Sequence, residues 1–225
     1  MKELSLDDFK AANAKNNSVI VDSRAPEIFS EGFIVESLSI FLDDNFLSRL
    51  HDLIADEQEI IFVCDEGQVA EIDKIVRGAG LTNLVGYLSG GFATWKNSER
   101  AVDVLIAIDA DEFAMDYQFD EFYLVDVRPI EEFEKEHVED AESIALTDLV
   151  QILAQLEASQ SFYIYGSTAA EAVMAGSIFK QYGFQRIRVL TDAYSSLKST
   201  RIPYFVQKKK DKPGPPLPNV GPANR

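Results

Sequence analysis

The chain has 225 residues, of which 46% are hydrophobic and 11% aromatic, a composition typical of a globular protein. This length is enough for two domains of about 100 residues, each able to bury a core. No run reaches the ~18 consecutive apolar residues of a membrane span, and the first ten residues, MKELSLDDFK, lack the apolar centre of a signal peptide. We therefore expect a cytoplasmic protein that does not insert into a membrane.

The net charge of −17 disfavours nucleic acid and anionic lipid as partners. The body of the chain is more acidic still, because Lys208, Lys209, Lys210 and Lys212 lie close to the carboxyl terminus. The simplest interpretation is a solvated acidic surface that aids solubility. The alternative is a docking surface for a basic partner.

Cys64 is the single cysteine, so an internal disulfide and a cysteine-based zinc site are excluded. A lone cysteine is most often a small buried apolar residue, and only its context argues for chemistry. His51 and His137 are the two histidines; neither has another histidine or a cysteine three or four residues on, and no metal site is expected.

One pattern occurs twice along the chain, as VIVDSRAPEIFSEGFIVESLSIFL and later as YLVDVRPIEEFEKEHVEDAESIAL. Asp22 and Arg24 of the first segment correspond to Asp126 and Arg128 of the second, an offset of 104 residues. An equal order of motifs at a nearly constant offset indicates a duplication.

The elements that follow are also paired. After the first segment we expect a helix over 45–55, a buried strand over 60–63 and a helix that ends at Gly80. The corresponding elements of the second copy are a helix over 147–158, a strand over 162–165 and a helix that ends at Gly183. Alternating strands and helices predict an α/β fold in which each copy has a mostly parallel sheet flanked by helices.

The expected domains are residues 1–100 and 101–206, joined by a short linker near 97–105, so the two should pack together. Residues 207–225 form a lysine- and proline-rich tail that predicts a disordered or extended polyproline segment. Such a tail is either a loose terminus or a peptide that docks on a protein partner.

Cys64 directly follows the strand over 60–63, at the edge where parallel sheets place ligands.

These motifs together resemble the rhodanese family, over all of the chain except the tail. In the first copy the likeness is carried by VDSRAPEIF with Asp22 and Arg24, EGFI, the strand into Cys64, AGL with Gly80, and LSGGFATW with Gly90, Gly91 and Trp95. The second copy repeats VDVRPIEEF and has His137 where such domains commonly have histidine. The resemblance implies two tandem rhodanese-like domains in which these Asp, Arg, Gly and Trp residues are structural.

In active members, as the resemblance implies, a loop cysteine takes sulfur from a donor such as thiosulfate or a persulfide and passes it to a thiol acceptor, without a cofactor. A thiolate is the nucleophile, and backbone N–H groups at a helix start favour the anion. Cys64 takes the cysteine's place here, and Gly67 takes that of the glycine that lets the backbone turn inward. The implied cradle of loop amides comprises Asp65, Glu66, Gly67, Gln68, Val69 and Ala70.

The loop departs from the family pattern in its charges. Val69 stands where many members have arginine, and Lys74 is the next positive charge along the chain. Asp65 and Glu66 bring negative charge beside Cys64, which disfavours a thiolate. Ala70 stands where the related phosphatase and arsenate-reductase branch needs arginine, so that activity is excluded.

In the second copy Gly166 falls at the cysteine position, which predicts a degenerate, catalytically silent domain. Ser167 and Thr168 follow, and we interpret them as a helix cap rather than as nucleophiles. Two functions remain open. One is a sulfurtransferase that works through a Cys64 persulfide; the other is a catalytically inactive binding or assembly module that uses its acidic surface and its tail.

Overall fold

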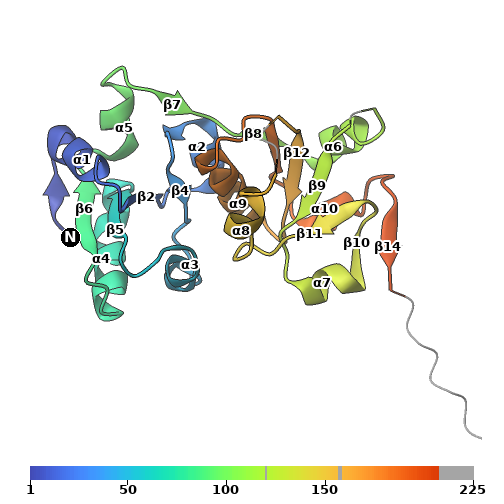
Figure 1. The fold of residues 1–225 in the computed structure, drawn as a ribbon, viewed down its shortest axis with the longest axis horizontal. Coiled ribbons are helices and arrows are strands. Elements are labelled where there is room, and N and C mark those ends of the chain that lie inside the picture. The colour runs from blue at the N-terminus through green and yellow to red at the C-terminus, as the bar shows by residue number, and fades with distance from the viewer. Residues whose placement is uncertain (120, 157–158, 208–225) are drawn as a thin grey trace, which may run out of the picture.

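The computed structural model describes residues 1–119, 121–156 and 159–207. Its first half contains a five-stranded sheet, parallel throughout, with the strand order β1-β6-β5-β2-β4 (Figure 1). Its strands are β1 (Glu3–Leu4), β2 (Ser18–Asp22), β4 (Leu38–Ser39), β5 (Glu59–Val63) and β6 (Leu84–Leu88). The central strand β5 ends directly before Cys64, as predicted.

Helices cover both faces of this sheet because the strands are apolar on both sides. They are α1 (Leu6–Asn13), α2 (Pro26–Glu31), α3 (Phe46–Leu53), α4 (Val69–Gly78) and α5 (Gly91–Lys96). Ile61 and Val63 of β5 share a core with α1 and α5, whereas Ile60 and Phe62 share one with α3 and α4. This alternation follows from the two-residue period of a strand.

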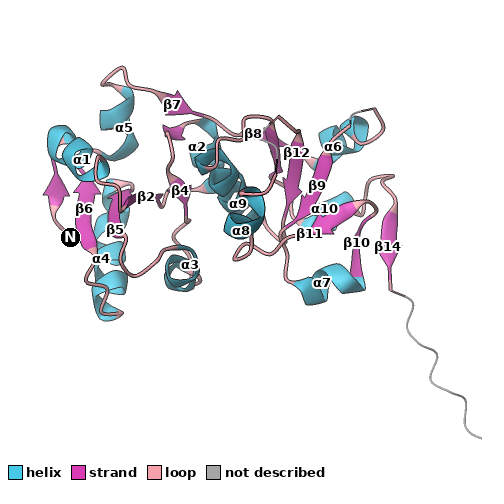
Figure 2. Ribbon diagram, in the orientation of Figure 1, coloured by secondary structure: helices cyan, strands magenta, loops and turns pink. Residues whose placement is uncertain are grey.

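The second half repeats the arrangement with the order β11-β9-β12-β13-β8, again parallel throughout. Its strands are β8 (Ile106–Ile108), β9 (Tyr123–Asp126), β11 (Ala141–Ser143), β12 (Phe162–Tyr165) and β13 (Ile187–Leu190). Its helices are α6 (Ala110–Asp116), α7 (Ile130–Lys135), α8 (Leu149–Leu153), α9 (Ala169–Gln181) and α10 (Tyr194–Leu197). The predicted α/β fold with two parallel sheets flanked by helices is thus confirmed (Figure 2).

Helix α9 lies between the two sheets and packs against both (Figure 1). On one side it contacts its own strands β12 and β13; on the other it contacts β4 and α2 of the first copy. Ser177 Oγ accepts a hydrogen bond of 3.0 Å from the buried backbone N–H of Ser39, across the boundary between the copies. One continuous apolar core therefore joins the two halves, as their short linker led us to expect.

Two small strand pairs lie outside the two main sheets, and one of them departs from the expectation of a plain linker. Residues of the linker form β7 (Val102–Asp103), which pairs with β3 (Phe33–Ile34) of the first copy. Near the end of the described chain, β14 (Tyr204–Val206) pairs with β10 (Glu136–Val138). The tail predicted to be disordered or extended lies outside the described residues from position 208 onward.

The two marker glycines end their helices as predicted. Gly80 follows α4 with a φ of +76°, and Gly183 follows α9 with a φ of +85°. Glycine tolerates this left-handed conformation without a Cβ clash. Among the described residues, no helix combines the length and apolar character needed to cross a membrane.

Candidate functional site

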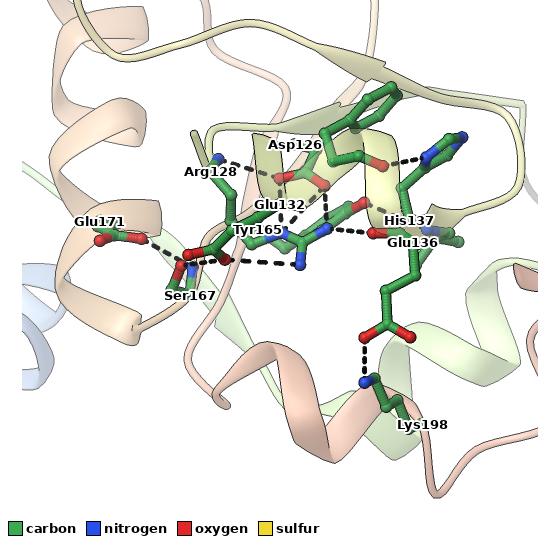
Figure 3. Close-up of polar contacts among 11 residues, drawn as sticks. Asp126, Arg128, Glu132, Glu136, His137, Tyr165, Ser167, Glu171 and Lys198 are labelled. Carbon is green, nitrogen blue, oxygen red and sulfur yellow. Dashed lines mark hydrogen bonds and ion pairs between the residues drawn. The ribbon is translucent and has the colours of Figure 1, made fainter. Parts of the chain in front are cut away.

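The paired Asp and Arg residues of the two copies build the same buried ion pair. Arg24 binds Asp22 through Nη2–Oδ2 at 2.6 Å and Nε–Oδ1 at 2.9 Å, and its Nη2 also donates to the carbonyl of Gly32. Arg128 binds Asp126 at 2.6 and 3.0 Å and donates to the carbonyl of Glu136 (Figure 3). Each pair ties the end of an interior strand, β2 or β9, to the segment that follows the next helix.

Cys64 is 2% exposed and lies at the carboxyl end of β5, next to the end of β2 in the sheet. Burial raises the pKa of its thiol to about 12, and the negative charges of Asp22 and Asp65 add to this effect. Among the described residues, none forms a hydrogen bond with the thiol. Cys64 is therefore a protonated thiol at neutral pH, with its reactivity restrained by burial and charge.

The glycine pair after β6 brings the start of α5 against Cys64. Gly91 has a φ of +57°, and a Cβ at this position would lie 2.7 Å from the Cys64 carbonyl oxygen. Gly90 has a φ of +67° and precedes the helix. Trp95 faces away into the core, where its Nε1 donates to the carbonyl of Ala101 at 3.0 Å. The glycines thus shape the site, whereas Trp95 supports the fold.

The predicted cradle divides into residues that reach the site and residues that do not. Asp65 and Glu66 line the pocket over Cys64 together with α2 and α5. Gln68 is bound elsewhere: its Oε1 accepts from the Asp65 N–H and from Ser23 Oγ, both at 3.2 Å. Val69 packs against the core.

Gly67 and Ala70 are exposed. A Cβ on Gly67 would meet open space, and the φ angle of this residue is not positive. The inward turn that the sequence suggested for Gly67 is therefore not required here. That the amides of residues 65–70 form a cradle for the sulfur stays a prediction. The Asp65 N–H already donates a hydrogen bond to Gln68 Oε1.

The pocket over Cys64 has a volume of about 420 Å³. Its lining residues are Arg24, Ile28, Glu31, Gly32, Cys64, Asp65, Glu66, Gly90, Gly91, Phe92, Ala93 and Lys96. The sequence pointed to Lys74 as the nearest cation, whereas the fold brings Arg24 and Lys96 to the pocket. The guanidinium of Arg24 lies over the ring of Phe92, 4.1 Å from its centroid.

Sequence reasoning missed Lys96 because it lies 32 positions beyond Cys64 in the chain. The sequence could have indicated Lys96 through the LSGGFATWK segment, because the short helix that begins at the glycine pair ends at this lysine. A larger pocket of about 600 Å³ lies where β9 and β12 begin, and it contains none of the predicted site residues.

In the second copy, strand register places Gly166 at the cysteine position. Asp22 pairs with Val63, the residue before Cys64, and Asp126 pairs with Tyr165, the residue before Gly166. A Cβ on Gly166 would lie 2.7 Å from the Cβ of Glu171 and 3.0 Å from its Oε2. The Glu171 side chain thus occupies the space that a cysteine side chain would need.

Ser167 and Thr168 lie at the start of α9. Thr168 is its N-cap residue and accepts from the Glu171 N–H, which confirms the helix-cap interpretation. The Ser167 N–H donates to Glu171 at 2.7 Å, and its hydroxyl donates to Glu132 at 3.2 Å (Figure 3).

Neither histidine lines the pocket over Cys64. His137 stacks on Phe133 with centroids 3.8 Å apart, and its Nδ1 lies 2.7 Å from the Phe133 carbonyl oxygen. His51 is exposed on α3. Within the described part of the chain, no group of three or more His, Cys, Asp or Glu residues is arranged to hold a metal ion.

Comparison with known proteins agrees with this architecture. The sequence profile of the rhodanese-like domain matches residues 5–98 and again 109–200. The chain is 25% identical over 146 residues to "Putative sulfur carrier protein YrkF" of Bacillus subtilis, covering 62% of this chain and 79% of that protein.

Two solved structures align with parts of this chain. One is the rhodanese-like domain of the Anabaena protein Alr3790, with 20% identity and a TM-score of 0.44 over 53% of this chain and 92% of that one. The other is a thiosulfate sulfurtransferase of Pseudomonas aeruginosa, with 14% identity and a TM-score of 0.41 over 90% of this chain and 43% of that one. With both halves matched by its profile, the chain belongs to the rhodanese family, as a tandem of two rhodanese-like domains.

Proposed function

We propose that the first domain carries sulfane sulfur as a persulfide on Cys64 and passes it to a thiol. The observation that supports this most is the position of Cys64, at the carboxyl end of the central strand and in the lining of a 420 Å³ pocket. Parallel sheets bind ligands at this edge. The similarity to a protein named as a sulfur carrier points in the same direction.

The chemistry requires a persulfide donor and a thiol acceptor. The Cys64 thiolate attacks the outer sulfur of a donor persulfide, so a new S–S bond forms as the donor's own S–S bond breaks. The donor leaves as a thiolate, which takes up the proton that Cys64 released. An acceptor thiolate then attacks the outer sulfur, and Cys64 leaves as a thiolate. The reducing cytoplasm supplies such thiols and suits this cycle.

Because burial and two carboxylates raise the pKa of Cys64 to about 12, the transfer should be slow at neutral pH. The thiolate fraction below the pKa rises about tenfold per pH unit, so loading should accelerate steadily across the alkaline range. The second domain contributes structure instead of chemistry, because Glu171 occupies the space beside Gly166.

The test is to incubate the full chain with a cysteine-derived persulfide at pH 9 and to determine its intact mass. We expect a gain of one sulfur atom that reduction removes and that is absent in Cys64→Ser. A gain that persists in Cys64→Ser, or no gain at all, contradicts the proposal.

The second candidate is a binding or assembly module without catalysis. It is favoured by the 2% exposure of Cys64 and by the Asp65 amide being bound to Gln68 instead of facing the thiol. In this case the acidic surface binds a basic partner, and the tail supplies a docking peptide. Removing residues 207–225 would then abolish recovery of a partner, while Cys64→Ser would leave that recovery intact.

A further inference from the structure

We propose that the Cys64 pocket selects persulfide donors that carry a positive charge, such as an ammonium group, and discriminates against anionic donors such as thiosulfate. This inference rests on the proposed function and names its substrate class. The sulfur-bearing end of the donor would reach Cys64, and its charged end would lie among the acidic side chains of the pocket.

The charges in the pocket lining carry the argument. Glu31, Asp65 and Glu66 are exposed carboxylates that line the pocket, and Lys96 is its exposed cation. Among the described residues, no ion pair involves Glu31, Glu66 or Lys96. Their charges are therefore available to a ligand.

Arg24 does not reverse this balance. It is 4% exposed, and its charge is neutralised by Asp22, which it contacts through both carboxylate oxygens. The pocket lining thus has three carboxylates and one cation, Lys96, that is not paired with a carboxylate, so its net charge is negative. A concave site of one predominant sign attracts the opposite charge and raises its local concentration.

Cys64 itself reports the sign of the field at the base of the pocket. Asp65, which no ion pair among the described residues neutralises, disfavours its thiolate, and the same negative charge disfavours a dianion that approaches the sulfur. A donor with an ammonium group two or three carbons from its sulfur would instead place positive charge near Glu31 or Glu66. The transfer step is unchanged: the donor's S–S bond breaks, the Cys64 S–S bond forms and the donor leaves as a thiolate.

The experiment compares donors that differ only at their far end. The persulfides of 2-aminoethanethiol, 2-mercaptoethanol and 3-mercaptopropionate carry an ammonium, a hydroxyl and a carboxylate. Loading of the full chain is followed by intact mass and normalised to each donor's rate with free 2-mercaptoethanol. We expect the ammonium donor to load Cys64 about tenfold faster than the carboxylate donor at low salt, with a smaller ratio at high salt.

Variants separate the pocket charges from the charge of the whole protein. Glu31→Gln with Glu66→Gln should lower the ratio at least about threefold, and Lys96→Gln should raise it. The matched control, Glu57→Gln with Glu112→Gln, removes two exposed carboxylates outside the pocket and should leave the ratio unchanged.

Equal loading by all three donors, or an equal effect of the control pair, would overturn the selectivity alone. Failure of every donor to load Cys64 would overturn the proposed function, and this inference with it.

Discussion

At the scale of single residues, the thiol of Cys64 is held in its protonated form by its surroundings. Burial is the largest cause of its raised pKa, followed by the charges of Asp22 and Asp65. Asp22 is fixed by its contacts with Arg24, so its contribution belongs to the fold. Asp65 is exposed in the loop, so its charge can be removed without opening the core.

Asp65→Asn should therefore make Cys64 more reactive. Removing a negative charge stabilises the thiolate and lowers its pKa, so alkylation by iodoacetamide at pH 9 should rise about threefold. Asparagine is also a good N-cap residue, so the following turn should persist. Asp56→Asn is the matched control and should not change the rate. A thiol in the unchanged protein that titrates with a midpoint below pH 9 would contradict this account.

Part of this environment could be predicted from the sequence. The apolar run over 60–63 placed Cys64 at a strand end, and the acidic neighbours of the thiol were visible beside it. Asp22 and Lys96 could not be placed, because one reaches the site across the parallel pairing of β2 with β5 and the other through the short helix α5. Contacts of this kind depend on the sheet and leave no local pattern.

At the scale of elements, the loops after β5 and β12 show how the two copies diverged. After β5 a short 3-10 helix (Glu66–Gln68, with N-cap Asp65) precedes α4, whereas after β12 the chain passes directly to Thr168, the N-cap residue of α9. Glu171 therefore lies in the first turn of α9, and its side chain folds back beside Gly166. The sequence identified the missing cysteine but not this side chain, because the displacement depends on where each helix begins.

Gly166→Ala should consequently destabilise the protein by about 1–3 kcal/mol, since its Cβ would overlap the Glu171 side chain. Gly67→Ala in the first copy is the control: its Cβ meets open space, so we expect no loss of stability. Urea denaturation of both variants measures the difference. Equal stability of the two would show that the space beside Gly166 is not filled as described.

At the scale of the whole molecule, α9 joins the two domains through a shared apolar core. Its buried side chains belong to a core that also contains Phe62 and Leu38 of the first sheet. The hydrogen bond from Ser39 to Ser177 lies within this core. A substitution that weakens packing in one domain should therefore lower the stability of the other.

Ser177→Ala should shift the unfolding of both domains together. It leaves the buried Ser39 N–H without its acceptor, which costs about 1–3 kcal/mol. Trp95, the single tryptophan, lies in the first domain and reports its unfolding by fluorescence. The midpoint from Trp95 fluorescence should fall with that from far-ultraviolet circular dichroism, and exposed Ser195→Ala should change neither. An unchanged Trp95 midpoint would indicate independent domains.

The most direct test of the central claim is a single-turnover transfer of labelled sulfur. The full chain is loaded at pH 9 with a persulfide whose outer sulfur is ³⁴S, separated from excess donor, and mixed with a thiol acceptor. We predict that the label leaves Cys64 and appears as the acceptor's persulfide, and that Cys64→Ser carries none. A protein that never acquires the label on Cys64, or that retains it when the acceptor is present, would contradict a sulfur-carrying role.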